Sequence, residues 1–266
     1  MKLLLVGNAM DNLSGQPMST YEMAREFSKE HDVTVCVLPN RWSNNIIKQN
    51  LESFGVKCVY DVEPEYDLII ASEWCPNVKG KKINIVRSEY DEETPIEADF
   101  WVCIRPSIQE HIIKEHGIPE GKTKVIYNGV DRERFKSIKK TPRDHFKIVA
   151  PCTIDSLRKK WLNHLISTLN PERHLYIYGV DYGITLDRSP FLHMKTARFD
   201  IETAIADADL VSGILLGRVN LEANSCGVLS EYYHPVTLER TEFLLPEEEF
   251  DKRHNIKNTV KYLLEI

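Results

Sequence analysis

The sequence lacks the cysteine pattern of a zinc protein or of a disulfide-rich secreted protein. Its six cysteines are scattered along the chain, and no two of them form a CxxC pair. Such spacing provides neither a zinc cage nor a disulfide framework. Because reduced thiols are typical of the cytosol, we expect a cytoplasmic protein.

Long hydrophobic runs are also missing. The apolar run at residues 3–6 is short, and no small-residue cleavage site follows it. No stretch approaches the roughly 20 apolar residues that are needed to cross a bilayer. We therefore expect a protein without an integral membrane segment.

The histidine spacings, the acidic run at residues 91–93 and the first loop also lack metal and dinucleotide motifs. The histidines include no HxH or HExxH spacing, and the acidic run at residues 91–93 contains no DxD arrangement. The loop expected at residues 8–19 lacks the GxGxxG spacing that lets a backbone approach a pyrophosphate. We therefore expect no metal and no resident cofactor, and we disfavour a nicotinamide-dependent enzyme.

The charge balance argues against a protein whose whole surface grips nucleic acid, because the formal net charge is -6 and the sequence pI is about 5.9. Residues 136–160 form a local exception, since they carry eight basic residues against Asp144 and Asp155. This basic island has two readings: a solvated linker followed by a helix start, or an anion-binding surface.

Apolar periodicity predicts an α/β protein. In the first half, helices are expected at residues 20–29, 45–54 and 107–115, between strands at 2–7, 32–38, 56–60, 67–71, 82–87, 98–104 and 123–127. The second half repeats the pattern, with helices at 158–169, 201–208, 220–225 and 254–266 and strands at 146–151, 174–179 and 210–212. Such alternation indicates parallel sheets covered by helices.

The chain loses its apolar periodicity between residues 131 and 146, which marks a connection between domains. We therefore predict two Rossmann-like domains, residues 1–140 and 141–266. Open α/β folds bind their ligands at the carboxyl ends of the strands, so we expect the chemistry in a crevice between the two halves.

The loop after the first strand offers polar groups instead of glycines. Ser14, Gly15 and Gln16 form a polar turn that leads into a helix N-terminus, which suits the hydroxyl groups of an acceptor. The alternative is an ordinary loop in which Ser19 caps the helix.

A specific resemblance begins at residues 98–135. There a strand ends in the sequence Asn128-Gly129-Val130-Asp131, and Phe135 follows. This segment resembles the retaining GT-B glycosyltransferases of the large family 4-like group that includes sucrose and glycogen synthases. Physically, Asn128-Gly129 permits a turn with positive φ, and Phe135 can plug the domain junction.

The resemblance extends over most of the chain and implies a GT-B fold, with two Rossmann-like domains facing each other across a cleft and a shortened second domain. At residues 148–158, Thr153 occupies the position of an arginine that grips the donor diphosphate in the family. Arg158 takes the place of the family's lysine, with Lys159 and Lys160 beside it. Cations at these positions stabilise the charge that a departing diphosphate gains.

Residues 205–227 resemble the donor-sugar segment of the same family. Glu222 matches the second of the family's two paired glutamates and is expected to bind the ribose hydroxyls. The first glutamate is replaced by Ile214, which leaves the donor sugar open. Gly217, Arg218 and Val219 precede an expected helix start, so they can face the donor phosphates or sugar.

The resemblance implies a hexosyl- or pentosyltransferase that uses a nucleotide-diphosphate sugar as co-substrate, with retention and without a metal. Glu89 lies where many relatives carry a histidine near the acceptor and is the candidate catalytic residue. The acceptor stays open among a glycan, a lipid-linked sugar, a small molecule and a hydroxymethylated base of phage DNA. Two alternatives remain: an inactive sugar-nucleotide-binding module and an epimerase of the same architecture.

Overall fold

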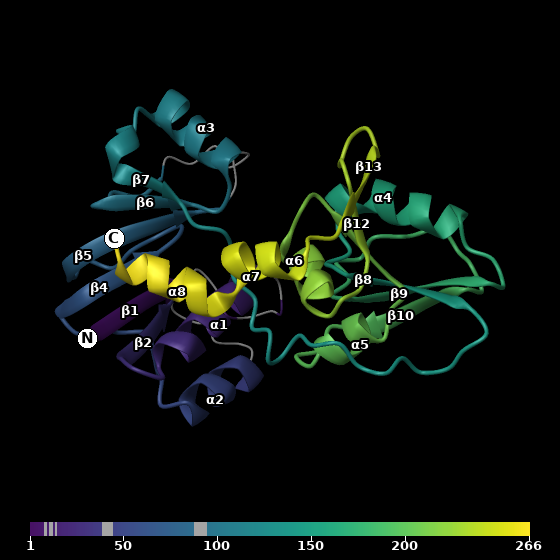
Figure 1. The fold of residues 1–266 in the computed structure, drawn as a ribbon, viewed down its shortest axis with the longest axis horizontal. Coiled ribbons are helices and arrows are strands. Elements are labelled where there is room, and N and C mark those ends of the chain that lie inside the picture. The colour runs from purple at the N-terminus through teal and green to yellow at the C-terminus, as the bar shows by residue number, and fades with distance from the viewer. Residues whose placement is uncertain (8–9, 11–12, 14, 39–44, 88–94) are drawn as a thin grey trace. The chain divides into compact units, whose positions relative to one another are not determined.

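The computed structural model describes residues 1–7, 10, 13, 15–38, 45–87 and 95–266. The chain divides into two compact units (Figure 1). The first comprises Met1–Asn12, Gln16–Gly129 and Arg253–Ile266, and the second comprises Leu13–Gly15 and Val130–Lys252. The division therefore lies at Gly129/Val130, eleven residues before the expected boundary at 140/141, and the C-terminal segment belongs to the first unit.

The first unit contains a seven-stranded sheet with the order β3-β2-β1-β4-β5-β6-β7. All neighbouring strands are parallel. The strands are β1 (Lys2–Gly7), β2 (Asp32–Val37), β3 (Lys57–Val59), β4 (Glu65–Ala71), β5 (Lys79–Val86), β6 (Phe100–Cys103) and β7 (Thr123–Val125). The helices are α1 (Gly15–Phe27), α2 (Asn45–Ser53), α3 (Pro106–His116), the 3-10 turn η1 (Glu120–Lys122) and the C-terminal α8 (Ile256–Leu264). Continuous apolar strands such as β1, whose Leu3 and Leu4 are 0% exposed, place the core at the centre of this sheet.

The second unit contains a six-stranded sheet with the order β10-β9-β8-β11-β12-β13. Its strands are β8 (Phe146–Pro151), β9 (Arg173–Gly179), β10 (Leu192–Thr196), β11 (Leu210–Ile214), β12 (Ser230–Tyr233) and β13 (Arg240–Phe243). The helices are α4 (Ser156–Ser167), α5 (Glu202–Ala206), α6 (Arg218–Ser225) and α7 (Glu247–His254). Strand β13 runs antiparallel to β12, and the other neighbours are parallel.

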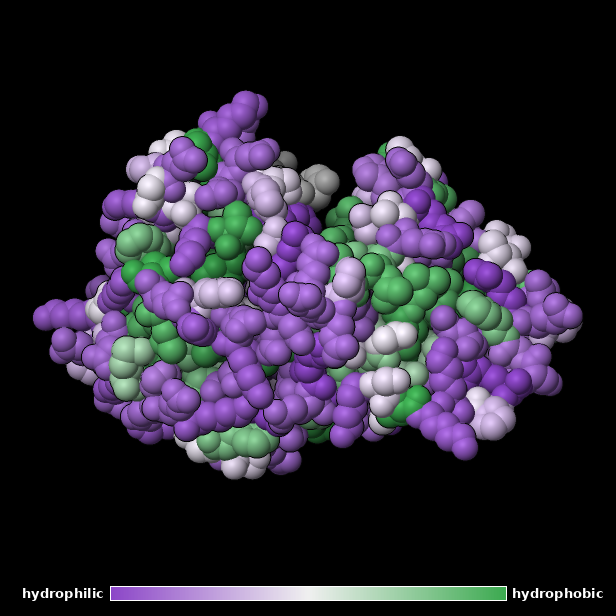
Figure 2. Space-filling view, viewed as in Figure 1, coloured by the Kyte–Doolittle hydropathy of each residue, from purple (hydrophilic) through white to green (hydrophobic). Residues whose placement is uncertain are grey.

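Each face of the second sheet has its own core. Trp161 and Leu162 of α4 pack on one face with Ile148 of β8. Phe135 packs on the other face with Val149 and Phe250. Phe135 is therefore a core residue of the second unit, which differs from the expectation that it plugs a domain junction. Hydrophilic side chains cover most of the face shown in Figure 2.

The turn at Asn128-Gly129 has a packing role that the sequence did not suggest. Gly129 is not among the glycines with positive φ, so the expected left-handed turn is wrong. A Cβ atom at Gly129 would lie 2.6 Å from the Ile256 Cα atom and 2.7 Å from the Thr259 hydroxyl of α8. The Thr259 hydroxyl donates to the Tyr127 carbonyl at 3.1 Å. Glycine is required here because α8 packs directly on this backbone.

Replacing Gly129 by alanine tests this close approach. We expect Gly129→Ala to destabilise the first unit by about 2 kcal/mol, because the added methyl group overpacks a backbone contact. Urea unfolding measures the loss, with Gly121→Ala as the matched control, since no atom lies within 4 Å of a Cβ built at Gly121. Equal unfolding midpoints for the two variants would contradict the packing role.

Three histidines and a tyrosine form a stack across β9 and β10 and the residue preceding β8. The rings of His145 and His174 lie 3.9 Å apart, and those of Tyr176 and His193 lie 4.3 Å apart. His193 Nε2 lies 3.2 Å from His174 Nδ1, so one ring must donate a proton and the other must accept it. Burial, followed by the nearby charges of His174, Lys195 and His145, lowers the pKa of His193.

This histidine stack predicts a loss of stability in mild acid. Because the folded state lowers the pKa of His193 below its ordinary 6.5, its contribution is complete above pH 6.5 and is lost as the pH falls through the lowered value. We expect the thermal midpoint to fall between pH 7.5 and pH 5, and to fall less in His193→Gln. Circular dichroism melts check this, with His116→Gln as control; an unchanged fall in His193→Gln would refute the assignment.

Candidate functional site

The second sheet reverses its strand order at β8, which is paired with β9 on one side and with β11 on the other. The chain leaves β8 through α4 toward β9 and returns through α5 to β11. In open α/β sheets such a switch point is where ligands bind, at the carboxyl ends of the strands. Two loops meet this description, residues 152–155 after β8 and residues 215–217 after β11, and we call them the switch-point loops.

The first switch-point loop is organised by Asp155, the N-cap residue of α4. Its carboxylate accepts the backbone N–H of Arg158 at 3.0 Å and the hydroxyl of Thr153 at 3.0 Å. The guanidinium of Arg158 forms an ion pair with the same carboxylate. Thr153 and Arg158, both predicted donor-binding residues, are thus brought together on Asp155, whereas the side chain of Lys159 is exposed.

The second switch-point loop leads into α6, which begins at Arg218, two residues earlier than expected. Gly217 precedes the helix in an extended conformation without a side-chain cap, and Val219 packs against the core. Arg218 Nε lies 2.6 Å from Glu222 Oε1, and the two side chains are only 7% and 8% exposed. Glu222 is therefore the anion of a buried ion pair.

Two residues that the sequence reading missed hold α6 in place. The Asn220 side chain is fully buried, accepts the Gly217 N–H at 3.1 Å and donates to the Glu231 carbonyl at 3.0 Å. The Glu231 carboxylate accepts the Ser212 hydroxyl at 3.0 Å and pairs with Arg240 at 2.7 Å. The hydrogen bonds of Asn220 tie the first turn of α6 to β12. In the sequence, the only sign of these contacts is that polar residues lie beside an apolar strand.

Backbone strain also marks the second switch-point loop. Leu215 has a φ of 58°, in the left-handed region. For an L-amino acid other than glycine this conformation costs roughly 1–2 kcal/mol, because the Cβ atom crowds the following carbonyl oxygen. The Leu215 N–H donates to the Tyr233 carbonyl at 2.9 Å, which holds the turn that joins β11 to α6.

The first unit gathers polar groups at the carboxyl ends of β4 and β5 and on α1. Arg87 donates to the Ser72 hydroxyl at 3.2 Å and to the Ser19 hydroxyl at 3.1 Å. Asn84, which is 1% exposed, donates to the Ser72 carbonyl at 2.6 Å. Sequence reasoning missed Arg87 and Asn84, although Arg87 lies only two residues before the predicted Glu89.

The predicted acceptor residues of the first half are placed in part. Gly15 and Gln16 form the first turn of α1, and the Gln16 Nε2 atom is buried without a hydrogen-bond partner among the described residues. Ser14 and Glu89 lie outside the described residues. Because α1 begins at Gly15, Ser19 is inside the helix, and the alternative in which it caps the helix is wrong.

Ion pairs neutralise much of the basic island. Arg143 pairs with Asp207 at 3.2 Å and with Asp209 at 2.8 Å. Lys140 pairs with Asp209, and Lys147 pairs with Asp207. Burial alone would raise the pKa of Asp207, but hydrogen bonds from Lys147 and from the Thr141 backbone outweigh it and lower the pKa to about 2. This part of the island is a structural network that anchors the linker to the second unit.

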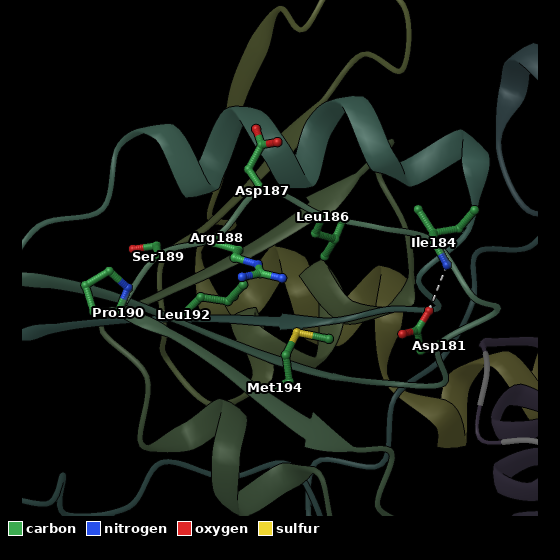
Figure 3. A pocket seen from close by; sticks show the side chains of 9 residues that line it. All are labelled: Asp181, Ile184, Leu186, Asp187, Arg188, Ser189, Pro190, Leu192 and Met194. Carbon is green, nitrogen blue, oxygen red and sulfur yellow. Dashed lines mark hydrogen bonds between the residues drawn. The ribbon is translucent and has the colours of Figure 1, made fainter.

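A separate depression of about 570 Å³ lies at the edge of the second sheet, beside β10 (Figure 3). Its lining includes Leu186, Leu192 and Met194, and the Arg188 side chain points across it. The segment that joins β9 to β10 contains no helix. None of the predicted site residues lines the depression.

Three further properties of the described residues concern thiol chemistry, metal ligands and membrane-spanning helices. Burial raises the pKa of Cys152, at the head of the first switch-point loop, to about 12, so this thiol stays protonated. Within residues that the structure describes, no three His, Cys, Asp or Glu side chains are grouped as metal ligands. No described helix has the length and apolar character of a membrane span.

Comparison with known proteins reveals similarity in structure. No family model matches the sequence, and no curated protein matches it. The crystal structure of Anabaena Alr3699/HepE in complex with UDP-glucose is similar over 100% of this chain and 99% of that chain, with a TM-score of 0.73 and 16% identity. A glycosyltransferase from Rickettsia africae is similar over 86% of this chain and 78% of that chain, with a TM-score of 0.61 and 14% identity.

The fold is GT-B. The same architecture appears in a putative UDP-N-acetylglucosamine 2-epimerase from Listeria monocytogenes, at a TM-score of 0.52 and 11% identity over 100% of this chain and 88% of that one. The two Rossmann-like units predicted from the sequence are thereby confirmed as a fold class. Because glycosyltransferases and an epimerase share this GT-B architecture, the function has to be argued from the site.

The buried pair of Arg218 and Glu222 yields a stability prediction. We expect Glu222→Gln to destabilise the second unit by about 3 kcal/mol, because it removes the negative charge beside a buried guanidinium. Glu52→Gln is the matched control, since Lys48 and Glu52 form an exposed pair with the same helical spacing at 3.8 Å. Urea unfolding compares the variants, and equally small losses would show that the Arg218–Glu222 pair is not an important buried interaction.

Proposed function

We propose that the protein is a glycosyltransferase that moves a hexose or pentose from a nucleotide-diphosphate sugar to an acceptor, with retention and without a metal, in the cytoplasm. The GT-B fold supports this proposal, as does the presence of UDP-glucose in the similar Anabaena structure. A second crystal structure of that protein contains UDP and glucose. UDP-glucose is therefore the first donor to test.

The observation that carries the proposal is the gathering of polar groups at the switch point of the second sheet. The carboxyl ends of β8 and β11 are neighbours, their loops contain Thr153 and Gly217, and Arg158 lies in the first turn of α4 directly after the first loop. We assign Thr153, Arg158 and the exposed Lys159 to the donor diphosphate, whose leaving charge needs cations or hydrogen-bond donors. We assign Glu222 to the ribose and the Gly217–Val219 backbone to the phosphates or the sugar.

Arg218 has a supporting part in this arrangement. Its 2.6 Å ion pair fixes the orientation of the Glu222 carboxylate, and the bonds of Asn220 fix the turn that carries both residues. A carboxylate held in this way is preorganised to accept hydrogen bonds from a vicinal diol. We therefore assign Arg218 to the donor site as the residue that orients Glu222.

The acceptor side is assigned to residues of the segments that follow β1 and β5. We propose that Ser14, Gly15 and Gln16 contact the acceptor and that Glu89 is the candidate catalytic residue. The buried Gln16 Nε2 donor supports a polar acceptor. The acceptor is a glycan, a lipid-linked sugar, a small molecule or a modified DNA base, and the ion pairs of Lys140, Arg143 and Lys147 weaken the support for DNA.

Mass spectrometry of products tests the proposal. The protein is incubated with UDP-glucose and other nucleotide sugars, together with candidate acceptors that include hydroxymethylated DNA. We expect free nucleoside diphosphate and a glycosylated acceptor. We expect Arg158→Ala to slow the release of nucleoside diphosphate at least tenfold, because the substitution removes a charge-assisted hydrogen bond to the leaving group.

Arg188→Ala is the matched control, because Arg188 is an exposed arginine of the same unit that lines the separate depression. An altered sugar without acceptor glycosylation would identify an epimerase, and binding without turnover would identify a sugar-nucleotide-binding module. Either result would replace the proposed activity. Equal losses in Arg158→Ala and Arg188→Ala would refute the site assignment.

A further inference from the structure

Three hydrogen-bond donors, one in the first switch-point loop and two on Arg158 in the first turn of α4, converge on one carboxylate. Asp155 Oδ2 accepts the Thr153 hydroxyl at 3.0 Å and pairs with the Arg158 guanidinium. Asp155 Oδ1 accepts the Arg158 backbone N–H at 3.0 Å. A cation, a hydroxyl and a backbone amide around one anion form an anion-binding arrangement that is already filled by a side chain of the protein itself.

The same donors are the ones that the proposed function assigns to the donor diphosphate. An aspartate and a diphosphate cannot share them without strong repulsion, because two like charges about 4 Å apart repel by roughly 4 kcal/mol at the effective dielectric of a protein surface. We propose that Asp155 is an internal competitor of the donor diphosphate, a residue that occupies the phosphate subsite and sets how tightly the donor binds. This inference rests on the proposed function.

Release of Asp155 is compatible with its surroundings. Its side chain is 29% exposed and that of Arg158 is 27% exposed, so the carboxylate can turn into water when a phosphate group takes its place. The phosphate oxygens then accept the hydrogen bonds of Arg158 and Thr153. Binding of the donor therefore requires that the ion pair between Asp155 and Arg158 is broken, which weakens the affinity. We expect removal of the aspartate charge to tighten binding.

Asp155 also caps α4, and a purely structural role makes the opposite prediction. Asparagine caps a helix N-terminus about as well as aspartate, so Asp155→Asn keeps the cap and removes only the charge. If Asp155 is only a cap, the substitution leaves nucleotide affinity unchanged or weakens it by loosening Arg158. If Asp155 competes with the donor, the substitution strengthens binding.

Isothermal titration of the full chain with UDP, inorganic pyrophosphate and uridine tests the competition. We expect Asp155→Asn to bind UDP and pyrophosphate about tenfold more tightly than the unmodified protein, with uridine binding unchanged. Asp181→Asn is the matched control, because Asp181 is an exposed aspartate of the same unit that also caps a turn through its side chain, to Gly183 and Ile184. A thermal melt of each variant verifies folding.

The outcomes separate the inference from the proposed function. If UDP binds the unmodified protein and Asp155→Asn binds it equally or more weakly, the competitor role is overturned and the transferase proposal stands. If pyrophosphate tightens in Asp155→Asn while neither protein binds UDP, the competitor role is supported and a UDP donor is excluded. If neither UDP nor pyrophosphate binds any variant, both proposals fail. If Asp181→Asn increases the affinity for UDP and pyrophosphate as much as Asp155→Asn does, the change in net charge alone explains the effect, and the competitor role is overturned.

Discussion

Strand β8 is hydrogen-bonded to β9 on one side and to β11 on the other, and this pairing determines where the second unit can hold a ligand. Parallel strands bring their carboxyl ends to one edge of the sheet. Where the strand order reverses, the two loops lead in opposite directions and leave a crevice between them in which ligands bind. Thr153 and Arg158 leave the first of these ends, and Gly217 and Glu222 leave the second. The candidate donor site is a consequence of this topology.

Charge pairing then decides how these loops are held before a ligand arrives. The Arg218–Glu222 pair is almost completely buried, and Asn220 fixes the turn beside it. The pair of Asp155 and Arg158 is partly exposed, and we propose that another anion can replace Asp155 in it. A buried pair at one loop and a partly exposed pair at the neighbouring loop are consistent with the proposed donor site, in which Glu222 orients a ribose and Arg158 binds a diphosphate.

The elements that the sequence predicted are those with strong apolar periodicity. Residues 2–7 and 146–151 are buried strands as expected, because a buried parallel strand is a continuous apolar run. Strands β10, β12 and β13 and helix α7 were not predicted. The segment LHMKT of β10 and the segment RTEF of β13 are largely exposed edge strands with little apolar content, so their pairing depends on neighbours that are distant in sequence.

Residue types in the sequence suggest a candidate site, whereas the partners of those residues depend on the fold. Glu222 and Arg158 are candidate site residues from the sequence alone, but their ion pairs with Arg218 and Asp155 depend on the helical geometry of α6 and α4. The glycine at 129 was recognised, yet its reason, contact with a helix more than a hundred residues later, is a tertiary effect. The paired part of the basic island depends in the same way on Asp207 and Asp209.

Amide hydrogen exchange with and without UDP tests the central claim most directly, because it reports where a nucleoside diphosphate contacts the chain. The account predicts slower exchange at residues 153–158 and 217–222, with no change at residues 184–194 beside the depression. Protection confined to the depression, or no protection at the two switch-point loops while UDP is bound, would contradict it.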